Sequence, residues 1–197
     1  MIEANFRKRF GEFELDASIS AEGMILLTGP NGSGKTTLLK AIAGYFSIDS
    51  GSIVVNSVNI TDMPVSARRA VYVGTDSSIN SLGVREHILW PKSSMSTAEK
   101  ERITDLLGID FDGKVGSLSL GQRIRVSIAT AIISEARILL IDEVLANISK
   151  VQEFAMAMRE LTSKQRIDVI AAMQTDSLRD IFDHSFAIDQ GSLSRLK

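Results

Sequence analysis

The sequence predicts an α/β protein with a mostly parallel sheet, a small antiparallel β part at the N-terminus and a helical part inserted in the middle. Three observations lead to this prediction. Continuous apolar runs at 24–28, 137–142, 169–173 and 186–189 are typical of strands buried on both faces. Stretches with helical spacing lie between such runs, and strands that alternate with helices indicate a parallel sheet. The middle, 78–134, has helical patterning and no such run.

The N-terminal part alternates between apolar and polar residues. Ile2, Ala4 and Phe6 share one parity, as do Phe13, Leu15, Ala17 and Ile19. A period of two predicts strands with one buried face. We expect these strands to be antiparallel and to form a separate small sheet.

The segment 78–134 reads as a helical subdomain inserted into the α/β core. Residues 96–109 have a polar helical face, with Ser96 or Thr97 as the cap and Gly108 near the end. A second helix opens within 117–133, and the Ser/Asn/Gly-rich stretch before the first one suits an entry hinge. After Asp142, the stretch 150–163 has one apolar stripe and predicts a helix that covers the sheet.

Composition narrows the class of protein. The chain has 197 residues, of which 44% are hydrophobic and 23% are charged, which predicts one globular domain over 1–197. The net charge of −2 argues against direct nucleic-acid binding, and the absence of cysteine excludes disulfides and thiol catalysis. The charged start does not resemble a signal peptide, and no apolar run reaches the roughly 18 residues of a membrane span. Any work at a membrane is therefore expected to go through another chain.

Residues 29–37 read GPNGSGKTT, between the apolar run 24–28 and a helical stretch. The pattern Gly-x-x-x-x-Gly-Lys-Thr is that of a P-loop, which predicts a P-loop NTPase core. Its glycines let backbone N–H groups converge on phosphates at a helix N-terminus. Lys35 is expected to reach the β- and γ-phosphates of ATP, and Thr36 to ligate Mg²⁺. The predicted phosphate-binding residues are Gly29, Pro30, Asn31, Gly32, Ser33, Gly34, Lys35, Thr36 and Thr37.

Two carboxylates follow the apolar run at 137–142. Asp142 ends the run, which places it at the carboxyl edge of the sheet beside the P-loop, where a Mg²⁺-binding aspartate belongs. Glu143 follows directly and points elsewhere, so it could polarise a water for attack on the γ-phosphate. These parts are shared by kinases, GTPases and many ATPases.

The residues Leu118-Ser119-Leu120-Gly121-Gln122, 20 residues before Asp142, separate these classes. Together with the P-loop and the Asp142 motif, in this order, they resemble the ATP-binding cassette (ABC) family. Its signature usually reads Leu-Ser-Gly-Gly-Gln. The resemblance covers almost the whole chain and implies that Phe10 stacks on adenine.

The resemblance also implies a mechanism. Two chains pack head to tail, and the signature residues Ser119, Gly121 and Gln122 of one chain close over the ATP of the other. ATP then holds a two-fold interface together, and hydrolysis releases it. The implied partners are a second ABC ATPase chain, identical or related, and a separate transmembrane permease, which would place the protein on the cytoplasmic face of a membrane.

The chain departs from the family at four places. Thr75 stands where the family has a Gln that ligates Mg²⁺, and Gln174 where it has a His at the γ-phosphate. Val144 and Ser149 replace a Pro and an Asp after the carboxylates, and Leu120 replaces a signature glycine. Glu143 remains, so slow hydrolysis is expected.

Two other readings stay open. A soluble ABC-family ATPase that acts on a protein or ribosome complex would need no membrane partner. Such proteins often carry two cassettes or a long insertion, and the single compact cassette here favours the transporter. A P-loop kinase with a coincidental signature would need a substrate-binding lid, which the sequence does not show.

Overall fold

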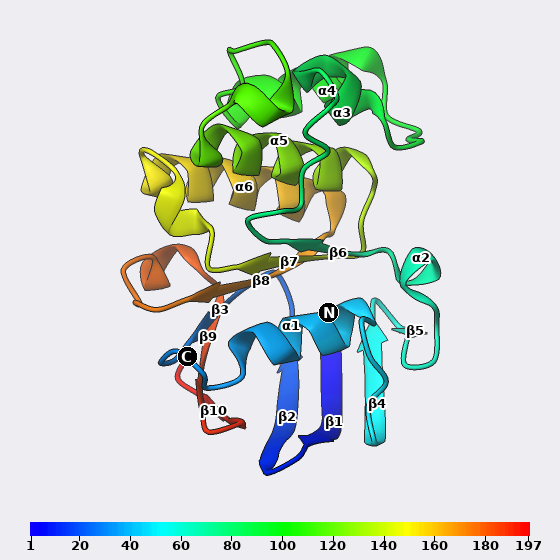
Figure 1. The fold of residues 1–197 in the computed structure, drawn as a ribbon, viewed down its shortest axis with the longest axis vertical. Coiled ribbons are helices and arrows are strands. Elements are labelled where there is room, and N and C mark those ends of the chain that lie inside the picture. The colour runs from blue at the N-terminus through cyan, green and yellow to red at the C-terminus, as the bar shows by residue number, and fades with distance from the viewer.

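The computed structural model describes residues 1–197, and ten strands join in one curled sheet (Figure 1). Their order is β5-β4-β1-β2-β10-β9-β3-β8-β7-β6. The strands are β1 (Ile2–Phe10), β2 (Phe13–Ala21), β3 (Met24–Thr28), β4 (Ser50–Val55), β5 (Val58–Asn59), β6 (Ala70–Val73), β7 (Ile138–Asp142), β8 (Asp168–Met173), β9 (His184–Asp189) and β10 (Ser192–Arg195).

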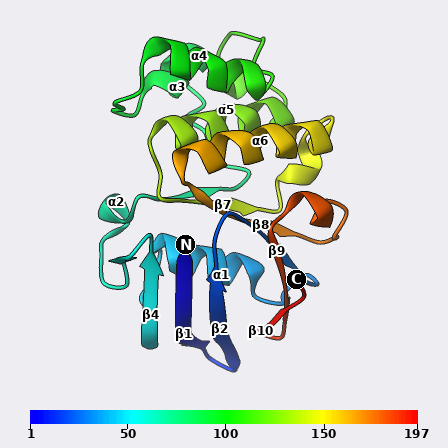
Figure 2. The same cartoon turned by 180° about the vertical axis from the view of Figure 1, so that it is seen from behind.

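Six α-helices accompany the sheet. They are α1 (Lys35–Ala43), α2 (Val65–Arg68), α3 (Val84–Leu89), α4 (Thr97–Leu106), α5 (Leu120–Ile133) and α6 (Val151–Gln165). Figures 1 and 2 show α1 on one side of the sheet and α5 with α6 on the other, with α3 and α4 stacked beyond α5. None of the helices is long and apolar enough to cross a membrane.

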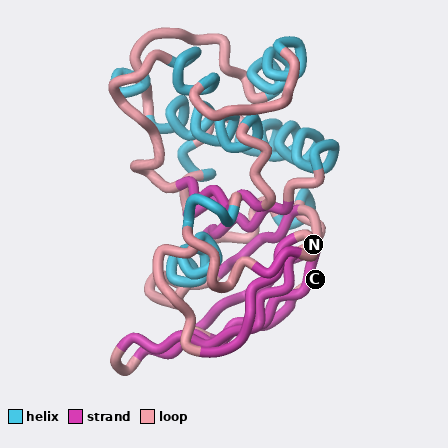
Figure 3. The backbone as a smooth tube through the Cα atoms, turned by 90° about the vertical axis from the view of Figure 1, so that its right-hand side faces the viewer, coloured by secondary structure: helices cyan, strands magenta, loops and turns pink.

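The predicted α/β fold is confirmed, including its parallel core. Strands β9, β3, β8, β7 and β6 pair in parallel, and β1 pairs antiparallel with β2 and β4. The expected separation of the antiparallel strands into their own sheet is wrong. Strand β10 folds back antiparallel on β9 and meets β2 in parallel through Ser192 and Asp16, so the two parts form one sheet that curls strongly (Figure 3).

Between β6 and β7 the chain forms α3, α4 and α5 and no strand. Helix α4 begins at the predicted cap: Ser96 Oγ accepts from the backbone N–H of Glu99, and the Glu99 side chain accepts from the N–H of Ser96. This reciprocal pair satisfies two N–H groups that the first turn leaves free. That residues 1–197 form one domain with 78–134 as its inserted subdomain remains a prediction.

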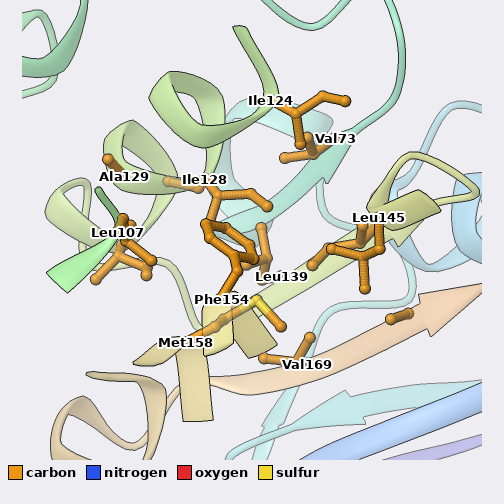
Figure 4. Close-up of a cluster of buried hydrophobic side chains, with 14 of the residues drawn as sticks. Val73, Leu107, Ile124, Ile128, Ala129, Leu139, Leu145, Phe154, Met158 and Val169 are labelled. Carbon is orange, nitrogen blue, oxygen red and sulfur yellow. The ribbon is translucent and has the colours of Figure 1, made fainter. Parts of the chain in front are cut away.

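The central strands are buried on both faces because successive side chains point to opposite sides of a sheet. On β7, Leu139 and Ile141 belong to the apolar cluster beneath α5 and α6, whereas Ile138 and Leu140 belong to the cluster beneath α1. Figure 4 shows the first cluster, in which Phe154 of α6 lies among residues of α5 and β7. Fully burying each such side chain stabilises the fold by about 1.5–3 kcal/mol.

A buried arginine holds the far end of α1. Arg68 is 4% exposed and donates hydrogen bonds to the carbonyls of Ala41 and Ile42, where α1 ends, and to those of Thr61 and Met63. A positive charge is favourable at a helix C-terminus, where carbonyls lack partners. Arg68 therefore fixes the helix whose other end begins at the P-loop.

Candidate active site at the carboxyl edge of the sheet

The glycine loop between β3 and α1 has the backbone of a phosphate cradle. Gly29 and Gly34 have φ of +156° and +112°, which side chains rarely adopt. A Cβ on Gly29 would also lie 2.2 Å from the carbonyl oxygen of Ile188, so only glycine fits there. Helix α1 starts directly at Lys35 with no side-chain cap, which leaves its first N–H groups directed at the loop.

Lys35 is 3% exposed, and its ammonium group is surrounded by oxygens. It donates to the carbonyls of Gly29 at 2.6 Å and Pro30 at 2.8 Å, and it lies 2.9 Å from Oε1 of Glu143. These three partners match the three donors of an ammonium group. An incoming phosphate would have to take the place of at least one of them.

Asp142 and Glu143 face different partners, as the sequence predicted. Asp142 Oδ1 accepts a hydrogen bond from Thr36 Oγ1 at 3.1 Å, and Oδ2 accepts one from the hydroxyl of Tyr72 at 2.6 Å. Glu143 turns away because its backbone is left-handed, with φ of +55°. A non-glycine residue in this region is uncommon, and such strain often accompanies functional sites.

Glu143 and Gln174 are brought together by the pairing of β7 with β8. The N–H of Glu143 donates to the carbonyl of Ala172, and Nε2 of Gln174 donates to Oε2 of Glu143 at 3.0 Å. Burial alone would raise the pKa of Glu143, but the hydrogen bonds from Gln174 and Lys35 and the charge of Lys35 hold that pKa below its usual range. The carboxylate is therefore ionised at neutral pH.

A cavity of about 530 Å³ opens over the P-loop. Its lining residues are Phe13, Asn31, Gly32, Gly34, Lys35, Thr36, Thr37 and Glu143. The oxygen of Ser33, a residue that is 3% exposed, has no hydrogen-bond partner beneath the loop. A buried ammonium group, an unpaired hydroxyl and a free helix N-terminus suit a phosphate chain.

Mg²⁺ would have few protein ligands here. No group of three or more His, Cys, Asp or Glu side chains is placed to hold a metal ion. Thr36 lines the cavity, and its hydroxyl and the Asp142 carboxylate bonded to it supply two adjacent oxygens. This small donor set fits Mg²⁺, which usually keeps several waters and is bound through one or two carboxylates plus substrate phosphates.

Thr75, the third predicted metal residue, makes no hydrogen bond to this pair. It is exposed, and the hydrogen bond of its hydroxyl is a long one to Asp76, at 3.4 Å. Instead, Tyr72 from the same stretch contacts Asp142. Burial, followed by the hydrogen bond to Asp142, raises the pKa of the Tyr72 hydroxyl well above its usual range, so it stays protonated.

The cavity is bordered by Phe13 and not by Phe10. Phe10 is 42% exposed at the end of β1 and packs edge-on against Phe46, with ring centroids 5.0 Å apart. Phe13 lies so close to the loop that a Cβ on Gly34 would be 3.0 Å from its ring. The period of two had assigned Phe13 to the core. In the sequence, Phe10 and Phe13 are three residues apart in the same hairpin, so this spacing made either ring a candidate for the adenine contact.

We expect Phe13→Ala to weaken ATP binding by about 5- to 150-fold, because base–aromatic stacking contributes about 1–3 kcal/mol. Phe10→Ala, the matched control from the same hairpin, is expected to change affinity less than twofold. Calorimetric titration with ATP and with inorganic triphosphate separates the base from the phosphates, since triphosphate affinity should not change. The reverse ranking of the two variants would restore Phe10 as the adenine contact.

The signature residues form the start of α5. Ser119 caps the helix: its Oγ accepts from the N–H of Gln122, and Oε1 of Gln122 accepts from the N–H of Ser119. Gly121 packs against the segment after Glu143, where a Cβ would lie 2.4 Å from the carbonyl oxygen of Asn147. Leu120, the departure from the usual glycine, packs against the apolar cluster beneath α5. None of these residues lines the P-loop cavity.

Comparison with known proteins agrees with this geometry. The family model described as "ABC transporter" matches residues 13–146, which is more than half of the chain. The chain is 28% identical to the probable branched-chain amino acid transport ATP-binding protein LivF of Archaeoglobus fulgidus, over 98% of this chain and 88% of that protein.

A second relative and a solved structure show further similarity to ABC transporter subunits. The chain is 35% identical to the molybdenum import ATP-binding protein ModC of Rhodobacter capsulatus over 77% of its length, but it spans only 45% of that protein. A solved ATP-binding subunit of an ABC transporter superposes with a TM-score of 0.81 at 20% identity, over 99% of this chain and 90% of that one. This last likeness concerns the fold.

Proposed function

The chain belongs to the ABC transporter family, and from that premise we propose that it is an ATP-binding subunit that hydrolyses ATP to power transport through a separate membrane chain. The observation that carries the proposal is a contact network beside one cavity: Lys35, Thr36 and Glu143 line it, and hydrogen bonds join Asp142 to Thr36 and Gln174 to Glu143. These side chains come from α1 and from the ends of β7 and β8, and together they offer a phosphate anchor, two metal ligands and a base.

Lys35 would first exchange Glu143 for phosphate oxygens. Its contacts with the Gly29 and Pro30 carbonyls keep the ammonium group at the loop while this exchange takes place. Mg²⁺, held by Thr36 and Asp142, would supply positive charge to the phosphates. Glu143, released from Lys35, is then free to accept the proton of an attacking water. Gln174 remains hydrogen-bonded to Glu143 and orients it, although a Gln cannot carry a proton as the family's His can.

We further propose that two chains close head to tail around ATP. The signature lies at the N-terminus of α5 and does not border the chain's own cavity, so its exposed Ser119 is available to a second chain. The cap of α5 uses the N–H groups of Ser119 and Gln122, and it leaves those of Leu120 and Gly121 without a side-chain partner, which suits a phosphate. ATP bound between two such surfaces would stabilise the dimer by mass action.

The surface around α3 offers a docking site for a partner chain. Ile79, Leu89 and Trp90 are 42%, 46% and 66% exposed, respectively, and lie before, in and at the end of α3. Single exposed apolar residues are ordinary, but a group that includes the only tryptophan marks an interaction site. We propose that the permease docks here and holds the protein at the cytoplasmic face of the membrane.

Trp90→Ala is expected to release the protein from membranes of a host that contains its permease, with at least a tenfold fall in the pelleted fraction. A buried interface tryptophan commonly contributes 2 kcal/mol or more, about 30-fold in affinity. Met156→Ala is the matched control, because Met156 is 63% exposed on α6. ATP binding should be unchanged in both. Sedimentation of the wild-type protein with ribosomes or a soluble complex, and not with membranes, would favour the soluble ABC ATPase.

A further inference from the structure

The carboxylate of Asp142 is held at both oxygens by side chains from different elements. Thr36, at the start of α1, donates to Oδ1 at 3.1 Å, and Tyr72, on β6, donates to Oδ2 at 2.6 Å. A carboxylate with only one of these partners would be free to rotate about its χ2 bond. The two hydrogen bonds together select one orientation.

The register of the sheet explains how Tyr72 reaches Asp142. Strands β6 and β7 pair in parallel with Tyr72 opposite Leu140 and Val73 opposite Ile141, so Gly74 comes next to Asp142. Because side chains alternate between faces, Tyr72, Gly74 and Asp142 all belong to the face that α1 covers. Gly74 has no side chain, and the Tyr72 ring lies over it: a Cβ there would be 3.1 Å from Cε1 of the ring.

The ring of Tyr72 is itself fixed in place. The ring of Tyr45, just after α1, meets it edge-on with centroids 5.7 Å apart, and the ammonium group of Lys40 lies 5.8 Å from its centroid. Tyr72 also packs against the apolar cluster beneath α1. These contacts leave the hydroxyl little freedom, so its direction is set before any ligand arrives.

We propose that Tyr72 is a positioning residue of the metal site: its hydroxyl holds Oδ2 of Asp142 so that Oδ1, on the Thr36 side, is presented to Mg²⁺. The role rests on the ATPase function proposed above. A partner behind a metal ligand orients it, and loss of such a partner typically lowers metal affinity or activity about 10- to 100-fold.

Tyr72→Phe tests the proposal, because it removes the hydroxyl and keeps the ring. Titration of Mn²⁺ into the ADP-bound protein, followed by electron paramagnetic resonance, is expected to show about tenfold weaker Mn²⁺ binding. Calorimetry of ADP in EDTA should give the wild-type affinity, since Tyr72 does not line the P-loop cavity. Tyr45→Phe is the matched control: it removes a hydroxyl from the neighbouring ring, which is 58% exposed, and should leave both values unchanged.

Gly74→Ala tests the contact between Tyr72 and Asp142 without removing the hydroxyl. The added methyl group would displace the Tyr72 ring. Mn²⁺ affinity should fall in this variant too, with ADP affinity in EDTA unchanged. Equal Mn²⁺ affinity in Tyr72→Phe and Tyr45→Phe would overturn the role of Tyr72 and leave the ATPase proposal standing. Wild-type protein that binds no nucleotide would overturn both. A parallel fall in metal-free ADP affinity would mark a general structural role and also overturn the assignment.

Discussion

Glu143→Gln is expected to lower ATP turnover by about a hundredfold or more, because removal of a general base typically costs 10²- to 10⁴-fold. Gln has almost the shape of Glu but cannot accept the proton of a water. ATP affinity should not fall, since the variant also frees Lys35 from its ion pair with Glu143. Steady-state phosphate release and calorimetry measure the two quantities. Glu153→Gln, on the exposed face of α6 and paired only with Lys150, is the control and should retain wild-type turnover.

The same variant reports on the proposed dimer. With hydrolysis blocked, Glu143→Gln protein in Mg-ATP should accumulate as dimers in light scattering. Adding Ser119→Arg should abolish them by placing a bulky side chain at the closing surface. Because Ser119 also caps α5, the comparison is with Ser119→Ala, which loses the same cap without the bulk. Turnover that persists in Glu143→Gln would assign the base elsewhere, and monomers at high protein and Mg-ATP concentration would count against a self-sufficient dimer.

Lys35→Ala is expected to weaken ATP binding by more than tenfold. Charge-assisted hydrogen bonds to phosphate are about twice as strong as neutral ones, and each factor of ten in affinity is about 1.4 kcal/mol. Because the Lys35 side chain is only 3% exposed, water is a poor substitute for its ammonium group, which makes a large loss of affinity more certain. Calorimetric titration of ATP measures the change.

Lys40→Ala is the control that separates the loss of a positive charge near the cavity from the loss of the phosphate contact of Lys35. Lys40 lies on the same helix, and the contact that the structure gives its ammonium group is with the Tyr72 ring. Loss of a positive charge near the cavity in general would lower ATP affinity in both variants. Loss of the phosphate anchor alone would lower it only in Lys35→Ala. Unchanged affinity in Lys35→Ala would remove the P-loop from the proposed mechanism.

Local sequence predicted most of the scaffold of this site. The run before the P-loop and the run before Asp142 both became buried parallel strands, β3 and β7, which is the structure that short continuous apolar runs favour. The ends of such strands meet at one edge of the sheet, so Thr36 and Asp142 were expected to lie together, and they are hydrogen-bonded. The helix caps at Ser96 and Ser119 are equally local.

The local apolar patterns did not predict that all ten strands join in one sheet. The period of two in β1 and β2 specifies a buried face and says nothing about which strand lies at the edge. The sheet became continuous because the last hairpin, β9–β10, places Ser192 beside Asp16, which lies 176 residues earlier in the chain. Such pairings depend on the whole fold, and strand patterns in isolation do not contain them.

By itself, then, the sequence determined that the glycine loop, Asp142 and Glu143 stand at one sheet edge, since each belongs to a short segment whose structure is set locally. Only the tertiary structure decided which side chains reach them. It selected Phe13 over Phe10 at the cavity and Tyr72 over Thr75 at Asp142. The reason is geometric: a hydrogen bond tolerates a few tenths of an ångström. Whether a side chain comes within hydrogen-bonding distance depends on the sheet register, on the missing Cβ of Gly74 and on the packing of α1. Segments that are distant in sequence establish these three features together.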